Sequence, residues 1–203
     1  MKKHLQILAL LAAFVLPLMA VAQVTVPYTQ GFEGSSMPSG WSHIGNGTAA
    51  PYSSSTYAHS GSYSLKFSGA TTDNVVVFPE FEAEASQLEL TIWMRPESFT
   101  SSSCGQFDVG YVTSATSASS FVAMETYSYS DFSAIASRMV TFPTAPTGAR
   151  IAIRHRANST AWYWFVDDVD IHIAPNCPKP ITLTATALDA HNAIVNWTPA
   201  FAE

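Results

Sequence analysis

The chain has 203 residues, of which only 12% are charged, and its formal net charge at pH 7 is −6. An acidic chain lacks the clustered Lys and Arg that bind phosphates, so we expect no nucleic-acid partner. The low charge content also disfavours amphipathic helices, which need a charged face opposite an apolar one.

The first 22 residues have the pattern of a secretory signal peptide. Basic residues at 2–4 precede a mostly apolar stretch over 5–19, and Ala20-Val21-Ala22 forms a small-residue cleavage site. The apolar stretch is shorter than the roughly 20 residues that span a bilayer. We therefore expect export to a secreted or cell-surface location, extracellular and without membrane insertion. Removing residues 1–22 leaves seven basic and 15 acidic residues, a formal charge of −8.

Strand signals then recur as far as residue 173, and no segment has a helical period. The predicted strands are Val24–Tyr28, Trp41–Ile44, Tyr63–Phe67, Val75–Phe78, Leu88–Arg95, Phe107–Thr113, Phe121–Tyr127, Arg138–Phe142, Ile151–Arg156, Trp162–Val166 and Val169–Ile173. Many short strands separated by Ser/Thr-rich loops predict an all-β domain over residues 23–174. We expect a two-sheet antiparallel jelly-roll sandwich.

Residues 148–173 have the pattern of a β-hairpin around a polar turn at 157–161. In the symmetric register, arginines and tryptophans face each other on one side of the hairpin. Indole faces stack on sugar C–H groups and guanidinium groups bond hydroxyls, so this side suits a glycan. The predicted ligand-binding residues are Arg154, Arg156, Trp162 and Trp164.

The alternative register places the tryptophans in the core and exposes Tyr163 and Phe165 instead. On the opposite side, His155 is expected to be a hydrogen-bonded core residue. Catalytic motifs such as GxSxG and HExxH are missing from the sequence, so we expect no enzyme activity.

A Pro-rich segment at 175–180 predicts an extended linker after the sandwich. Residues 181–203 then show two alternating strands separated by a turn, which resemble the start of a fibronectin type III domain and would be a truncated, Ig-like unit. Cys104 and Cys177 would form one disulfide in an exported chain, or remain two partly buried thiols.

Four segments together resemble the MAM-like, choice-of-anchor J and cleaved-adhesin jelly-roll domains of secreted and surface proteins of Bacteroidetes. They are YTQGFEG with MPSGW at Tyr28–Trp41, YAHSGSYSLKF at Tyr57–Phe67, Phe107–Ser128, and ARIAIRHR with WFVDDVDI at Ala149–Ile171. The resemblance implies a concanavalin-like or MAM-like sandwich that acts as an accessory unit without catalysis, beside further domains of the same polypeptide. Its partner would be a glycan or a host or cell-surface protein.

The same resemblance implies a structural Ca²⁺ where the first strand, the His-Ser-Gly loop and the last strand meet. The matching positions are Glu33, Ser60, Asp167 and Asp168. Calcium takes six to eight oxygen ligands, which carboxylates and loop carbonyls provide. The alternative is that the two aspartates only end a strand and cap turn amides.

These observations favour an exported, non-catalytic module that acts as an adhesin or binds carbohydrate. Two other functions fit the same sequence. One is a structural spacer or accessory domain of a secreted peptidase or glycosidase, and the other is a domain for protein–protein adhesion.

Overall fold

The computed structural model describes residues 23–69, 71–158, 162–175, 182–187, 189 and 192–198. The predicted signal peptide, Cys177 and the linker beyond residue 175 lie outside the described residues. Within the described ranges, no helix has the length and apolar character needed to cross a membrane.

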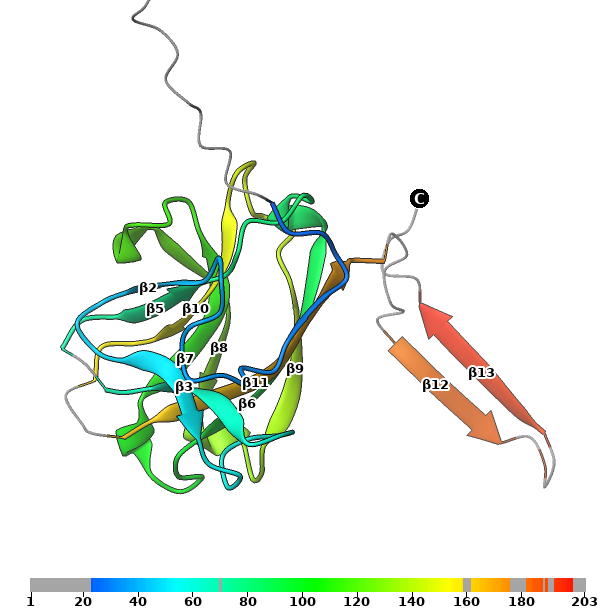
Figure 1. Cartoon of the computed structure of the whole chain (residues 1–203). Helices are drawn as coiled ribbons and strands as arrows, with labels where there is room; N and C mark the ends of the chain where they lie inside the picture. The colour runs from blue at the N-terminus through cyan, green and yellow to red at the C-terminus, as the bar shows by residue number, and fades with distance from the viewer. Residues whose placement is uncertain are drawn as a thin grey trace, which may run out of the picture.

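Two antiparallel sheets pack face to face in the main domain, which confirms the all-β jelly-roll class (Figure 1). The six-stranded sheet has the order β3-β4-β11-β6-β9, with β1 also paired to β11. Its strands are β1 (Tyr28–Gln30), β3 (Ala49–Ser53), β4 (Tyr63–Phe67), β6 (Leu88–Pro96), β9 (Ala136–Thr141) and β11 (Trp164–Ile173). The five-stranded sheet consists of β2 (Ser42–Ile44), β5 (Asn74–Val77), β10 (Arg150–His155), β7 (Gln106–Val112) and β8 (Phe121–Ser128).

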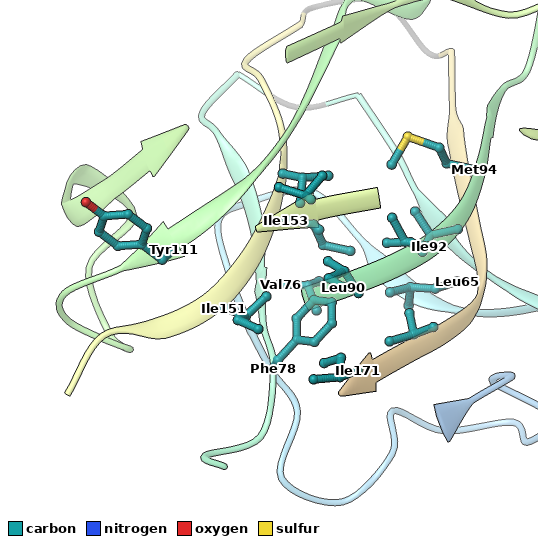
Figure 2. Packing of buried hydrophobic residues seen from close by; sticks show 14 of the residues in the cluster. Leu65, Val76, Phe78, Leu90, Ile92, Met94, Tyr111, Ile151, Ile153 and Ile171 are labelled. Atoms are coloured by element: carbon teal, nitrogen blue, oxygen red, sulfur yellow. The ribbon is translucent and has the colours of Figure 1, made fainter. Parts of the chain in front are cut away.

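Alternating side chains build the core between the sheets. In β6, Leu90, Ile92 and Met94 are fully buried, whereas the residues between them lie on the outer face. Figure 2 shows these side chains meeting Val76 and Ile153 from the other sheet. Burial of this apolar surface is the main contribution to the stability of the sandwich.

A β-bulge interrupts β11 between Asp167 and Asp170. Asp168 has a positive φ of 39° there, and the extra residue resets the alternation. As a result Val166 and Val169 both lie in the core, while Asp167 and Asp170 both belong to the outer face. The two strands predicted for this segment, Trp162–Val166 and Val169–Ile173, are therefore one bulged strand.

The predicted hairpin of residues 148–173 is wrong. β10 pairs with β5 and β7, whereas β11 pairs with β1, β4 and β6, so the two strands belong to different sheets. The chain crosses from one sheet to the other after β10. The short polar turn in the sequence is equally compatible with this crossing and with a hairpin.

Strand β3 was not predicted, because its segment Ala49–Ser53 contains Pro51 and leads into a Ser/Thr-rich loop. It lies at the edge of the six-stranded sheet, where a proline is tolerated.

After the main domain, β12 (Thr182–Ala187) and β13 (Ala193–Thr198) form a separate two-stranded antiparallel sheet. The two strands were predicted there, and a fibronectin type III domain remains a prediction.

Candidate functional site

Three of the four residues predicted as metal ligands, Ser60, Asp167 and Asp168, lie together at the β11 bulge. Asp167 Oδ2 accepts hydrogen bonds from the backbone N–H groups of His59 (2.7 Å) and Ser60 (3.2 Å). The Ser60 hydroxyl donates to Asp168 Oδ1 at 2.9 Å, and His59 Nδ1 lies 2.6 Å from Asp168 Oδ2. The two adjacent aspartates therefore hold one end of the loop that connects β3 to β4.

Glu33 holds the residues that follow directly, where the loop joins β4. Its carboxylate accepts hydrogen bonds from the backbone N–H groups of Ser62 (3.0 and 3.1 Å) and Tyr63 (3.0 Å). Gly61, at φ 60°, lies against the carboxylate so closely that a side chain there would collide with it. The sequence Ser60-Gly61-Ser62 is thus shaped to fit Glu33.

The donor chemistry of this cluster suits calcium. Three carboxylates and the Ser60 hydroxyl are hard oxygen donors, and no described Lys or Arg forms an ion pair with Glu33, Asp167 or Asp168. Ser64, fully buried on the neighbouring strand β4, has an Oγ without a hydrogen-bond partner among the described residues. In this structure, however, the carboxylates of Glu33 and Asp167 accept hydrogen bonds from backbone N–H groups of the loop.

Among the described residues, no group of three His, Cys, Asp or Glu side chains is placed to hold a metal ion. A bound Ca²⁺ would therefore require these carboxylates to turn from the loop amides toward a shared point. Calcium stays a prediction, and the cluster is a loop anchor in its own right.

The loop over residues 54–62 lies across the outer face of the six-stranded sheet. The Tyr57 ring stacks on Phe165 with 4.0 Å between centroids, and the His59 ring stacks on Trp93 with 3.5 Å. Arg95 donates to the carbonyl of Thr56 at 3.1 Å. Two stacked ring pairs and the carboxylates hold the loop in one position on the sheet.

A groove of about 350 Å³ lies beside this loop, between β1, β6 and the β11 bulge. Trp93 contributes its partly exposed indole, and most of the other lining side chains are polar. The lining residues are Thr29, Gln30, Gly31, Thr91, Trp93, Asp168, Val169 and Asp170. An indole with hydroxyl and carboxylate groups around it can stack on an apolar ring face and hydrogen-bond its substituents.

Trp93 and Asp168 are fixed before any ligand arrives. Stacking on His59 limits the orientation of the indole, and the carboxylate of Asp168 is held by the His59 ring and the Ser60 hydroxyl. Asp168 also has a backbone conformation that non-glycine residues rarely adopt. Such strained residues cluster at functional sites, where the surrounding structure over-determines them.

The predicted Arg/Trp face is not assembled. Arg154 and Arg156 lie on the outer side of the five-stranded sheet, and both bond the buried Asp108. Arg154 Nη2 is 2.6 Å from its carboxylate and Arg156 Nε is 2.8 Å from it. Arg154 also pairs with Asp73 at 2.9 Å. Both guanidinium groups therefore neutralise carboxylates of the protein itself.

Trp164 belongs to the core and not to the surface. It is fully buried, stacks on Phe107 with 5.2 Å between centroids, and donates its indole N–H to the carbonyl of Cys104 at 2.8 Å. Trp162 is 36% exposed and lies on the connection before β11, outside both sheets. The exposed Arg/Trp arrangement was wrong because it depended on the hairpin.

His155 is a buried, hydrogen-bonded core residue, as expected. Its ring lies 3.0 Å from the carbonyl oxygen of Cys104 and 3.2 Å from that of Ser68, and burial lowers its pKa. Cys104 is a free, buried thiol whose pKa is raised by burial. The disulfide alternative involves Cys177, which the structure does not describe.

A scan against protein-family models finds no match, and a search of curated proteins finds none. Solved structures share the fold. The K1 cleaved adhesin domain of Lys-gingipain from Porphyromonas gingivalis W83 has a TM-score of 0.59 and 19% identity, covering 73% of this chain and 98% of that domain. The K3 cleaved adhesin domain of the same protein gives 0.55 and 20%, with 71% and 96% covered.

The CBM22-1 xylan-binding domain from Paenibacillus barcinonensis Xyn10C has a TM-score of 0.52 and 11% identity, with 75% of this chain and 97% of that chain covered. Identities this low establish a shared jelly-roll sandwich. They confirm the likeness to cleaved-adhesin domains at the level of the fold, whereas the choice-of-anchor J likeness remains a prediction.

Sequence reasoning missed Trp93 although the signal was present. In the segment Leu88–Arg95, strict alternation places Trp93 on the same face as Glu89, Thr91 and Arg95. An indole on an otherwise polar strand face marks a partly exposed aromatic residue. The contribution of β1 and the β11 bulge to the groove could not be anticipated, because it depends on long-range pairing.

Proposed function

We propose that this domain is a non-catalytic carbohydrate-binding module, and that its groove beside Trp93 holds the sugar. The observation that carries the proposal is the indole of Trp93, stacked in place and lining a groove with hydroxyl and carboxylate groups. Aromatic faces stack on pyranose C–H groups, while Thr91 and Asp170 offer hydrogen bonds to ring hydroxyls. The likeness to a xylan-binding domain supports the proposal at the level of the fold.

The other polar residues of the groove agree with a neutral ligand. Asp168 and Asp170 both carry carboxylates, and none of the described Lys and Arg residues lines the groove. An anionic sugar would meet two negative charges at short range without a cation to offset them. Neutral oligosaccharides built from xylose, glucose or galactose are therefore the first ligands to test.

The experiment compares two single tryptophan variants by isothermal titration against a panel of neutral oligosaccharides. Trp93→Ala should weaken binding at least about tenfold, the effect of removing a central aromatic contact. Trp162→Ala removes a more exposed indole outside the groove and should leave the affinity unchanged. Equal affinities of both variants and wild type would overturn the groove as the site.

A second candidate function is protein–protein adhesion, favoured by the fold shared with two cleaved adhesin domains. Export to the cell surface and attachment to further domains belong to both proposals. Absence of binding to every neutral glycan on an array, together with binding to a surface protein that Trp93→Ala abolishes, would favour adhesion.

A further inference from the structure

A second feature of the same sheet face involves a lysine between two tyrosine rings. Lys66 on β4 has its ammonium 4.2 Å from the ring centroid of Tyr52 and 4.2 Å from that of Tyr163. Tyr52 comes from the edge strand β3, and Tyr163 directly precedes β11. Three separate segments thus place the ammonium of Lys66 against two tyrosine rings. We call Lys66, Tyr52 and Tyr163 the Lys66 clamp.

The ammonium of Lys66 differs from the other described cations. Each described arginine donates hydrogen bonds to carbonyl or carboxylate groups of the protein. Lys66 makes no hydrogen bond or ion pair with any described residue, and its stabilisation comes from the two rings alone. An ammonium has three donors and no acceptor, so all three are left for water or for a ligand.

Nearby groups include a second cation and one carboxylate: Glu97 accepts a hydrogen bond from the backbone N–H of Tyr163 at 3.1 Å and attracts Arg95 electrostatically. In the strand register, Phe165 lies between Lys66 and Arg95. Arg95 bonds only carbonyl oxygens and stacks over Tyr57 (5.0 Å) and Phe99 (4.6 Å). Two cations among aromatic rings, neither paired with a described carboxylate, lie in a domain whose overall charge is negative.

We propose that the Lys66 clamp is a second binding site, for a sugar carboxylate such as that of a hexuronic acid. The ring of Tyr52, 39% exposed, would stack on the C–H face of the pyranose. The ammonium of Lys66 would pair with the carboxylate in a charge-assisted hydrogen bond. This inference rests on the proposed carbohydrate-binding function but uses residues outside the Trp93 groove.

The two sites then differ in the sign of their charge. The Trp93 groove contains carboxylates and no lysine or arginine, whereas the clamp presents an ammonium without a described carboxylate partner. An oligosaccharide with both neutral and uronic acid residues would have a matching site for each kind of residue. If the oligosaccharide bound in the opposite orientation, its uronic carboxylate would lie in the groove and be repelled by Asp168 and Asp170.

The test titrates the intact chain with trigalacturonic acid and with its methyl ester, which has the same shape without the charges. Wild type should bind the acid at least about tenfold more tightly than the ester, and added salt should reduce the difference. Lys66→Met keeps the apolar stem between the rings and should abolish this preference. Arg138→Met is the matched control, since Arg138 also stacks on two rings, those of Tyr127 and Phe132, but is hydrogen-bonded.

The outcomes separate this inference from the proposed function. Trp93→Ala should leave the binding of trigalacturonic acid unchanged while it weakens the binding of neutral sugars. Equal binding of acid and ester by wild type, or an unchanged preference in Lys66→Met with an unchanged melting temperature, would overturn the clamp as a site. Tighter binding of a poly-glutamate peptide than of the sugar acid would also overturn it, because the partner would then be an acidic peptide.

Discussion

Asp108 and Asp167 are both fully buried, one on the outer side of each sheet, and they are neutralised in different ways. The carboxylate of Asp108 forms ion pairs with Arg154 and Arg156 and accepts a hydrogen bond from the hydroxyl of Thr126. Asp167 receives only backbone N–H groups and has the carboxylate of Asp168 beside it. The first carboxylate is part of a complete ionic network, and the second keeps a negative charge that no described cation balances.

The pKa values follow this difference. Burial acts to raise the pKa of Asp108, but hydrogen bonds from Arg156, Thr126 and Arg154 outweigh burial and hold it below its usual value. At Asp167 burial raises the pKa, the amide donors offset only part of that effect, and Asp168 adds to it. The network around Asp108 balances its charge, whereas the charge of the buried Asp167 is offset only by backbone N–H groups.

Removing Asp108 should give the largest loss of stability. Asp108→Ala would leave Arg154 and Arg156 without their shared carboxylate, and we expect the free energy of unfolding to fall by about 3 to 5 kcal/mol, as for other broken buried pairs. Asp73→Ala removes a more exposed carboxylate that pairs with Arg154 alone, so a loss of about 1 kcal/mol is expected. Urea unfolding monitored by tryptophan fluorescence measures both. Equal losses would show that Asp108 is not the centre of the network.

The sequence predicted the fold class because alternation over short segments is a local property. It predicted nine of the main-domain strand positions in outline, overlapped β1 only at Tyr28, and missed β3, where Pro51 removes a hydrogen-bond donor that only an edge strand can lack. It could not predict which strands pair. The hairpin error followed directly, because consecutive strands in a sandwich can belong to either sheet.

The three candidate sites differ in how far the sequence could have located them. Trp93 follows from alternation within one strand. The resemblance to known domains named Glu33, Ser60, Asp167 and Asp168 together; the structure places all four along the residue 54–62 loop, and their role as metal ligands stays a prediction. The Lys66 clamp joins β3, β4 and the start of β11, so no single segment of the sequence marks it. The core position of Trp164 likewise follows from the pairing of β11 with β4 and β6, which the sequence does not show.

A bound Ca²⁺ would balance the charge of Asp167, as the two arginines balance that of Asp108. We propose that Ca²⁺ raises the melting temperature of wild type and that EGTA reverses the rise. A ligand at 100 times its dissociation constant adds about 2.7 kcal/mol to the folded state. Asp168→Asn should remove the response, and Asp73→Asn, on the other sheet, should retain it. No metal in elemental analysis and no shift with Ca²⁺ in a thermal scan would leave the cluster as a loop anchor only.

The loop anchor itself should have a smaller effect. In the presence of EGTA, Glu33→Ala leaves the N–H groups of Ser62 and Tyr63 without an acceptor, and we expect a loss of about 1 kcal/mol. Faster proteolysis within residues 54–62 should accompany it, because the loop would open locally. Glu82→Ala, at an exposed site whose side chain makes no described hydrogen bond, is the matched control. Unchanged proteolysis in Glu33→Ala would contradict the anchoring role.

The smallest effect is on the pH dependence of stability in EGTA, where the two carboxylates should act in opposite directions. Asp108 has a lowered pKa in the folded state, so its contribution is present above the ordinary pKa of 3.8 and is lost as the pH falls below it. Asp167 has a raised pKa, so the folded state binds more protons and loses stability as the pH rises from 3.8 through the folded-state pKa. Urea unfolding at closely spaced pH values from about 3 to 7, a range that spans carboxyl titration, measures both limbs. Asp108→Asn should flatten the acidic limb and Asp167→Asn the limb above it. If both variants changed the free energy of unfolding over the same pH range, the two carboxylates would be neutralised in the same way, which would contradict the difference proposed between the two sheets.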